Sequence, residues 1–248
     1  MYKRQIYSNT RVGSGWNANP VKISGDYEAY SLDVLLLAVK NGATAAAWPY
    51  YRTSPAQAAI FANARDAGST WGAEARISDW MDHVALGDLE IWPGGTAMAI
   101  WEADNATGHG VFWSARTPSG SWGSGGSGQL GGWFTLTGGC ALALGDDGSG
   151  AALWGFVDGT KPMGEQSGIM AATWPPGGPW NPPEALMEGY GRVHIWREGM
   201  APRPGGRTVG AVWWVQTPAS VSPTQYATFY TSWPDHRVYL PLAVRDHG

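Results

Sequence analysis

Several features that define common protein classes are scarce in this sequence. Cys140 is the single cysteine among 248 residues, so no disulfide can form within the chain. Charged residues make up 15% of the chain and the formal net charge is −4, which argues against nucleic acid or an anionic membrane as a partner. No apolar run reaches the length of a bilayer span, and the residues after Met1 lack the apolar stretch of a signal peptide. We therefore expect no nucleic acid partner and no membrane span.

The usual motifs for metals, phosphates and nucleophilic catalysis are missing as well. The five histidines do not follow a His-x-x-x-His or His-x-His spacing, and one cysteine cannot build a structural zinc site. No glycine-rich stretch is a credible phosphate cradle, and no Gly-x-Ser-x-Gly elbow lies between a strand and a helix pattern. We expect neither a metal nor a cofactor.

Glycine and tryptophan, in contrast, are abundant, with 36 and 16 residues. Hydrophobic residues make up 44% of the chain, which is enough for a packed core. Glycine-rich turns between aromatic segments are typical of short strands, and no segment has a sustained helical period. The composition therefore indicates an all-β protein.

Two series of tryptophans repeat along the chain with nearly the same period. In the first series each tryptophan ends a run of small apolar residues, and the steps are 53, 53 and 59 residues. Its members are Trp48, Trp101, Trp154 and Trp213. In the second series most members follow a glycine-rich turn, and the steps are 55, 51, 58 and 53 residues. Its members are Trp16, Trp71, Trp122, Trp180 and Trp233. Two series with one period indicate a true structural repeat.

Each repeat holds four strand patterns, which is the content of a β-propeller blade. We therefore predict a single β-propeller domain over 1–248, built from about four and a half to five blades of four antiparallel strands. The predicted units are a half blade at 1–25, full blades at 26–80, 81–131 and 132–189, and a last blade with a C-terminal tail at 190–248. A tryptophan that recurs once per blade is typical of packing between neighbouring sheets, so we interpret the first series as structural.

One segment resembles the Asp-box, or bacterial neuraminidase, repeats of sialidase-like propellers. Ala64–Trp71 matches the motif Ser/Thr-x-Asp-x-Gly-x-Thr-Trp at every position except the first. In that family the aspartate ties the turn by accepting backbone N–H groups, so the resemblance implies structural roles for Asp66, Gly68 and Trp71. It also implies a bacterial protein that is secreted or on the cell surface, and an N-terminally incomplete six-bladed propeller. A five-bladed ring is the alternative.

The loops between the second and third strands share one face of a propeller with the loops between blades, and family active sites lie on this face. Aromatic rings and carboxylates gather there, and both are suited to sugars. The candidate ligand-binding residues are Tyr50, Tyr51, Arg52, Asp82, Glu102, Asp104, Asp158, Tyr190 and Arg192.

Sialidase activity requires three arginines on the substrate carboxylate, a tyrosine nucleophile with a glutamate partner, and an acid/base aspartate. The sequence offers only weak catalytic candidates for these roles, namely Tyr51, Glu102, Asp104 and Arg52. We therefore favour an extracytoplasmic bacterial module that binds a glycan or a cell-surface protein without catalysis. A sialidase-like glycoside hydrolase, or a fragment of one, is the alternative, and a purely structural blade array is the third hypothesis. The oligomeric state stays open.

Overall fold

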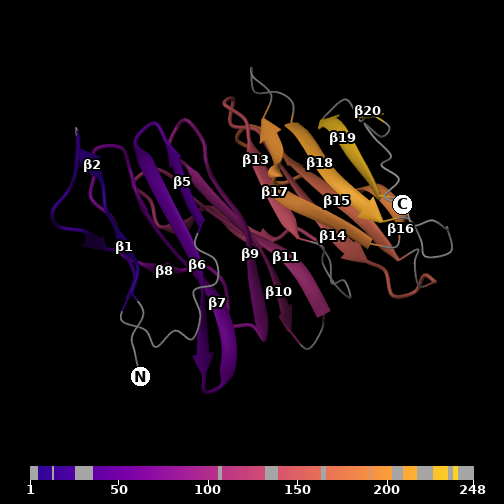
Figure 1. The fold of residues 1–248 in the computed structure, drawn as a ribbon, viewed down its shortest axis with the longest axis horizontal. Helices are drawn as coiled ribbons and strands as arrows, with labels where there is room; N and C mark the ends of the chain where they lie inside the picture. Colours follow the sequence, from indigo (N-terminus) through magenta and orange to yellow (C-terminus); the bar gives the residue numbers. More distant parts are fainter. Residues whose placement is uncertain are drawn as a thin grey trace.

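The computed structural model describes residues 5–12, 14–25, 36–105, 108–131, 139–162, 166–190, 192–202, 209–216, 226–233 and 237–239. These residues form twenty strands and no helix (Figure 1). Sixteen of the strands form four antiparallel sheets of four, each paired in chain order. The protein is therefore all-β and of the β-propeller type, with four-stranded antiparallel sheets as its blades.

The first sheet consists of β5 (Leu36–Lys40), β6 (Ala43–Thr53), β7 (Ala56–Arg65) and β8 (Ala75–Arg76). The second consists of β9 (His83–Ile91), β10 (Ala97–Asn105), β11 (Gly108–Arg116) and β12 (Trp122–Gln129). The third consists of β13 (Cys140–Leu144), β14 (Gly150–Val157), β15 (Ser167–Trp174) and β16 (Glu184–Tyr190). The fourth consists of β17 (Arg192–Pro202), β18 (Val209–Gln216), β19 (Tyr226–Trp233) and β20 (Arg237–Tyr239).

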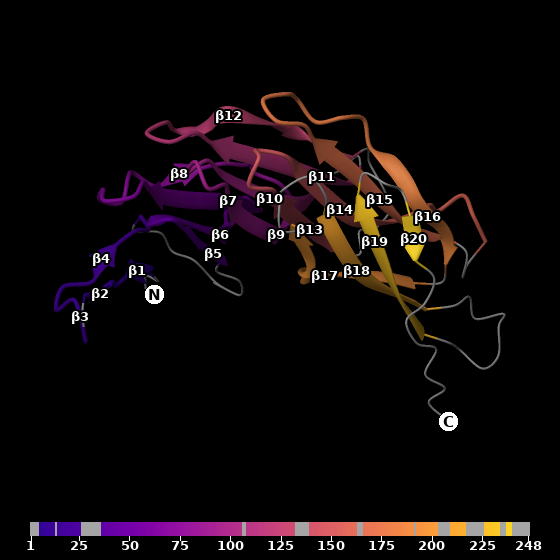
Figure 2. The same ribbon diagram turned by 90° about the horizontal axis from the view of Figure 1, so that it is seen from above.

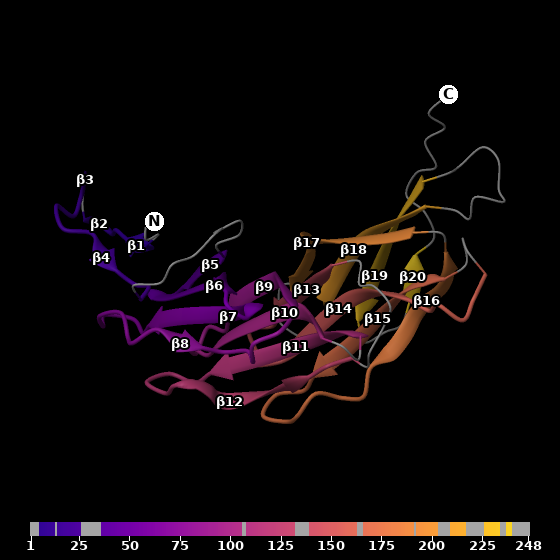
Figure 3. The same ribbon diagram turned by 90° about the horizontal axis from the view of Figure 1, so that it is seen from below.

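The four sheets stand side by side in an arc (Figures 2 and 3). The first strands of successive sheets, β5, β9, β13 and β17, contact one another along its concave side, whereas β12 and β16 lie on the convex side. We call the end of the sheets that carries the β9–β10, β13–β14 and β15–β16 connections the turn end. The opposite end, with the β6–β7 and β10–β11 connections, is the loop end.

Two short hairpins precede the first sheet and lie at the opposite end of the arc from the fourth sheet. In them β1 (Tyr7–Ser8) pairs with β4 (Val21–Lys22), and β2 (Arg11–Val12) pairs with β3 (Gly15–Trp16).

The contacts of these hairpins recur 54 residues later in the chain. The Ile6 N–H donates to Ser24 Oγ at 2.8 Å, and the Ile60 N–H donates to Ser78 Oγ at the same distance. Likewise the Ile23 N–H donates to the Ile6 carbonyl, as the Ile77 N–H does to the Ile60 carbonyl, both at 2.9 Å. The β1–β4 pair thus repeats the geometry of the third and fourth strands of the first sheet.

The first and second sheets pack through small side chains. Alternate residues of β6 and β7, mostly alanines, form one buried cluster with alternate residues of β9 and β10. Trp101 is the large member of this cluster and is 3% exposed. Small side chains of this kind allow two sheets to approach closely.

The second and third sheets pack through larger side chains and one buried carboxylate. Trp113 and Trp154 are buried in this interface, Trp154 with no exposed surface. Asp88 accepts the Leu142 N–H of β13 at 2.9 Å and the Leu89 N–H at 2.8 Å. Backbone donors satisfy this buried carboxylate, and the bond from Leu142 ties β9 to β13.

A bulge next to Asp88 brings the two first strands together. The β9–β10 register shifts between Ile100 and Trp101, which leaves Gly87 without a partner residue. A Cβ at Gly87 would lie 2.0 Å from Cys140 Sγ and 2.9 Å from the Cys140 carbonyl oxygen. Only glycine fits this contact between the second and third sheets.

The first tryptophan series is buried where the structure describes it. Trp48, Trp101 and Trp154 are 2%, 3% and 0% exposed, and each lies in a core cluster. Trp213 lies in β18, where the side chains fall outside the described part of the structure. In the second series the residue after the tryptophan bonds back to the neighbouring strand: Gly72 N–H donates to Ala64 O, and Asn181 N–H donates to Thr173 O.

The Asp66 carboxylate is bound differently from the expectation for an Asp box. It accepts hydrogen bonds from both terminal nitrogens of Arg116, at 2.8 and 3.3 Å, and from the Ser119 N–H at 2.9 Å. These partners belong to the second sheet and its β11–β12 turn, so Asp66 links two sheets instead of closing its own turn. The hydrogen bond from Arg116 holds the pKa of Asp66 below its ordinary value.

Candidate functional site

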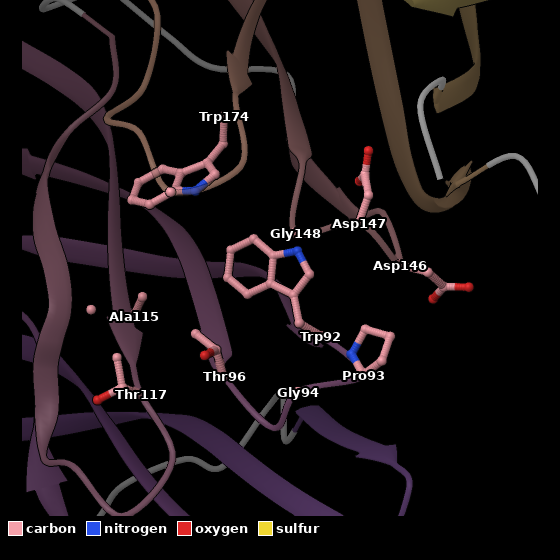
Figure 4. A pocket seen from close by; sticks show the side chains of 12 residues that line it. Trp92, Pro93, Gly94, Thr96, Ala115, Thr117, Asp146, Asp147, Gly148 and Trp174 are labelled. Carbon is pink, nitrogen blue, oxygen red and sulfur yellow. The ribbon is translucent and has the colours of Figure 1, made fainter. Parts of the chain in front are cut away.

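A groove of about 420 Å³ opens between the second and third sheets at the turn end (Figure 4). We call it the turn-end groove. The β9–β10, β13–β14 and β15–β16 turns form part of its wall, and the ends of β11 and β15 with Gly125 of β12 form the rest. The lining residues used below are Trp92, Thr96, Thr117, Asp146, Asp147 and Trp174.

Each of these turns is closed by local hydrogen bonds. In the β9–β10 turn the Trp92 N–H donates to Thr96 O and the Gly95 N–H to Trp92 O, both at 2.8 Å. Gly95 has a φ of 88°. A left-handed φ is easily adopted by glycine, and Gly148 takes the same conformation in the β13–β14 turn with a φ of 85°. The turns are therefore well-defined walls for the groove.

Two indole rings form the apolar part of the groove. The Trp92 Nε1–H donates to the Ser149 carbonyl at 2.9 Å, which holds its ring against the third sheet. Trp174 packs edge-on against Trp113 and Trp180, with ring centroids 5.0 and 5.4 Å apart. The Trp92 and Trp174 rings are 6.3 Å apart and tilted by 48°. Both rings border the groove in Figure 4, although Trp92 is a core residue with 7% of its surface exposed and Trp174 is only partly buried.

Polar side chains flank the two rings. Thr96 and Thr117 lie on one side of the groove, and Asp146 and Asp147 lie on the other (Figure 4). Asp147 Oδ1 accepts the Ser149 N–H at 3.0 Å and the Ser149 hydroxyl at 2.5 Å, as in an Asx turn. Asp146 is exposed and accepts Lys40 Nζ of the first sheet at 3.1 Å. The groove thus offers rings and hydrogen-bonding groups to one ligand.

The surroundings of the groove are rich in carboxylates. Glu90 and Asp88 lie on the part of β9 that leads to Trp92. Burial, with the nearby Asp88 charge, raises the pKa of Glu90 to about 7 despite the opposing effect of Lys40. Arg116, one residue before Thr117, is bound to Asp66 on the first-sheet side. No arginine lines the groove among the described residues.

At the loop end, Tyr50 and Arg52 contact the same aromatic side chain. The Arg52 guanidinium lies 4.1 Å from the ring centroid of Trp80 and donates to Gln57 Oε1. Tyr50 packs edge-on against Trp80, with centroids 5.7 Å apart. Trp80 thus makes a cation–π contact with Arg52 and an aromatic contact with Tyr50.

Tyr51 and Glu102 occupy different inter-sheet spaces. The Tyr51 ring packs on the cluster between the first and second sheets, and its hydroxyl donates to Val84 O at 3.4 Å. Trp101 and Ala103 face this same cluster, so strand alternation places Glu102 on the opposite face of β10, toward the third sheet. Tyr51 and Glu102 therefore do not share a cavity in which a tyrosine nucleophile could act with a glutamate partner.

Asp104 lies between two histidines on neighbouring strands. His83 Nδ1 is 3.7 Å from Asp104 Oδ1, and His109 Nε2 is 3.8 Å from Asp104 Oδ2. The backbone N–H of Asp82 donates to the Asp104 carbonyl at 3.1 Å. Within the described chain no three His, Cys, Asp or Glu side chains are grouped to hold a metal ion.

The remaining candidates lie in the third sheet and at the start of the fourth. Asp158 Oδ1 accepts the Thr160 N–H at 3.0 Å and the Thr160 hydroxyl at 2.6 Å, and the hydroxyl bond in particular lowers the pKa of Asp158. Tyr190 ends β16 and Arg192 begins β17, but their side chains lie outside the described part.

A second cavity of about 380 Å³ lies between the first and second sheets near the loop end. Its lining includes Arg76, Asp79, Met81, Trp101, Phe112 and Gln129. None of the described candidate ligand-binding residues lines either cavity.

The sequence pattern placed the candidate residues at the loop end, so it did not predict the residues of the turn-end groove. A signal for them exists in the sequence. Trp92 and Trp174 fall outside both tryptophan series, and each directly precedes a proline- and glycine-rich turn. A tryptophan that breaks the repeat and borders a turn is a reasonable marker for a binding residue.

No family model matches the chain, and no curated protein is similar to it at a significant level. Several solved structures have a similar shape. A glycosyl hydrolase from Bacteroides ovatus has 10% identity and a TM-score of 0.47, over 84% of this chain and 69% of that one. The GH93 α-L-arabinofuranosidase of Fusarium graminearum has 12% identity and a TM-score of 0.48, over 88% and 70%. Zg3597, a family 117 glycoside hydrolase of Zobellia galactanivorans, has 14% identity and a TM-score of 0.45, over 97% and 75%.

These similarities are weak in sequence and in superposition. Among the residues that the structure describes, no helix is both long and apolar enough to cross a bilayer.

Proposed function

We propose that this protein is a carbohydrate-binding module that holds a glycan in the turn-end groove without catalysis. The observation that carries the proposal is the position of Trp174, whose ring is held by two edge-on indoles and borders a groove lined by carboxylates and hydroxyls. As part of this proposal, we place the module outside the cytoplasm, as the resemblance to Asp-box proteins favours.

The chemistry of the groove suits a pyranose. Indole faces bind the C–H faces of sugar rings, and fixed oxygen acceptors bind their hydroxyl groups. Because neighbouring rings already hold Trp174 and a hydrogen bond to Ser149 holds Trp92, little side-chain entropy is lost when a ligand binds. The cavity volume falls within the range of small-ligand sites.

Sialidase-like hydrolysis is supported less well by these side chains. It requires an arginine clamp on the substrate carboxylate. Arg52 is engaged with Trp80 and Gln57, and the described lining of the turn-end groove holds carboxylates in place of arginines.

The test is calorimetric titration of the chain with neutral oligosaccharides, with tryptophan fluorescence as a second readout. Trp174→Ala should abolish binding, and Thr117→Val should weaken it while leaving the indoles in place. Trp16→Ala is the matched control, because Trp16 is 70% exposed and lies in the N-terminal hairpin, away from the groove.

The protein should also release no reducing sugar from any oligosaccharide that it binds. If Trp174→Ala and Thr117→Val both bind as tightly as the unmodified chain, the groove is not the site. Thermal melting of each variant separates loss of binding from loss of fold.

A further inference from the structure

We infer that β5, together with the two paired strands β1 and β4, forms a docking surface for an apolar β-hairpin of another polypeptide. We call the β1–β4 pair the half-sheet. The hairpin adds two strands to the free edge of β1 and lies over β5. This surface is at the end of the arc opposite the fourth sheet, away from the turn-end groove, so the inference does not depend on the proposed function.

The exposed large hydrophobic side chains of the described chain are concentrated in this part of the molecule. They are Tyr7, Trp16, Val21, Leu37 and Val39. Leu37 and Val39 point to the same face of β5 and are 62% and 63% exposed. Two such residues on one strand leave an apolar strip that is open to solvent, and a strip of this kind marks an interaction surface.

The equivalent positions are buried in the second and third sheets. In each sheet one of these residues pairs with the position two before the repeated tryptophan of the second strand, and the other pairs with the position four before it. The members in the second and third sheets are between 1% and 5% exposed. The two sets are Leu37, Leu89 and Leu142, and Val39, Ile91 and Leu144.

The first strand of the preceding sheet covers the buried members of both sets. Leu89 and Ile91 of β9 share a core cluster with Leu36 of β5. The Leu142 N–H of β13 donates to Asp88 of β9. By the same repeat, the chain that fits on Leu37 and Val39 is the first strand of one more sheet.

The half-sheet supplies only the outer two strands of such a sheet. Ile6 and Ile23 of the half-sheet pack in one cluster with Trp48 of β6 and Phe61 of β7, which leaves Leu37 on β5 exposed. Among the described strands β1 pairs with β4 alone, whereas the equivalent strand β7 pairs with both β6 and β8. The free edge of β1 therefore offers backbone groups to one more strand.

The repeat also specifies the chemistry of the hairpin. Its strand beside β1 corresponds to β6, β10 and β14, which are runs of small apolar residues that contain a tryptophan. Tyr7 is equivalent to Phe61, which pairs with Trp48, so the tryptophan of the hairpin lies opposite Tyr7. Its other strand corresponds to β5, β9 and β13 and presents leucine or alanine to Leu37 and Val39.

A second copy of the half-sheet does not fit this surface. Two copies joined in antiparallel fashion through β1 are related by a two-fold axis perpendicular to the joined sheet. The first sheets of both copies would then have to lie over the same face of that sheet. The free edge therefore fits two strands that carry no further sheet on this face.

The probe is a fluorescein-labelled synthetic peptide of residues 83–105, and its binding to the full chain is measured by fluorescence anisotropy. This segment contains β9 and β10, a first and a second strand, and its four carboxylates favour solubility. We expect saturable binding. Leu37→Asp and Val39→Asp should each weaken it by about tenfold or more, because each places a charge in an apolar contact.

Tyr7→Pro tests whether the peptide joins the edge of β1. The Ile6 N–H donates to Ser24 on the side of β4, so strand alternation directs the Tyr7 N–H to the free edge. Proline removes this donor and is tolerated in an edge strand, so the variant should weaken binding as strongly as Leu37→Asp. Trp16→Asp is the matched control, since it places the same charge on another exposed apolar residue in the neighbouring hairpin.

The Trp16→Asp variant should bind like the unmodified chain, and a scrambled peptide should not bind. Melting curves of the variants should match the unmodified chain, because the four substituted positions are exposed. The docking surface is wrong if the peptide does not bind, or if Leu37→Asp binds it as tightly as the unmodified chain. Weakening by Leu37→Asp without weakening by Tyr7→Pro would refute strand addition to β1. A chain that doubles its mass in light scattering, and stays single as Leu37→Asp, would show that a second copy is the occupant and would overturn the hairpin.

Discussion

The space between the first and second sheets and the space between the second and third are packed with different side chains. Between the first and second sheets the core consists mostly of alanines packed around Trp101. Between the second and third sheets it contains Trp92, Trp113 and Trp154, together with the buried carboxylate of Asp88.

Each space opens into a cavity beside its aromatic residues. The first opens near Trp101 and Phe112 toward the loop end, and the second opens near Trp92 and Trp174 at the turn end. Alanine side chains fill little space between two sheets, whereas indole rings fill much more. The choice of core residue thus decides where a ligand can enter a stack of otherwise similar sheets.

The largest expected effect comes from removing the central tryptophan of each space. Trp101→Ala and Trp154→Ala should each lower the free energy of unfolding by about 3–5 kcal/mol, because each leaves a large cavity. Urea unfolding measures the loss. A near-native unfolding midpoint for Trp101→Ala would show that the alanines between the first and second sheets hold them together without the indole of Trp101.

The next effect concerns the closest approach between the second and third sheets. Gly87→Ala should destabilise the protein by about 1–3 kcal/mol, because the new methyl group overlaps Cys140. Cys140→Ala in the same chain should recover part of the loss but not all, since the Cys140 carbonyl stays in place. Gly94→Ala is the control, because a Cβ there meets no atom within 4 Å. Equal unfolding midpoints for the two glycine variants would contradict the contact.

The smallest effect depends on pH. The pKa of Glu90 is raised to about 7, so its stabilising contribution is complete below the ordinary value of 4.5 and is lost as the pH rises through 7. Glu90→Gln removes this loss. After allowance for solvent screening of a partly exposed group, the variant should gain about 1–2 kcal/mol at pH 8.

Melting curves of both proteins at pH 4.5 and pH 8 test this. The difference in Tm should be larger at pH 8. A constant difference across this range would mean that Glu90 ionises as it does in the unfolded chain.

The sequence predicted the repeated architecture well, because one period governs both the strands and their packing. The small-apolar runs that end in Trp48, Trp101 and Trp154 are the second strands of the first three sheets. The all-β class and the four-stranded sheets follow from this pattern.

The candidate site was not predictable in the same way, since it depends on which turns meet across two sheets. Trp92 and Trp174 are 82 residues apart, and only the packing of the second sheet against the third brings their ring centroids to 6.3 Å. The partner of Asp66 was also not predictable, because its motif suggests a bond within its own turn and the structure shows one 50 residues away.

The bond between Asp66 and Arg116 also affects how the chain loses its structure. Each sheet of a propeller-type stack touches only its neighbours, so stability spreads along the stack through such pairwise links. Asp66 of the first sheet is bound by a turn of the second sheet, so the stability of the first sheet depends partly on that turn. Asp88 links the second sheet to the third in the same way. Unfolding that begins in one sheet therefore removes partners from the next, which favours cooperative loss of the three sheets over the independent melting of separate blades.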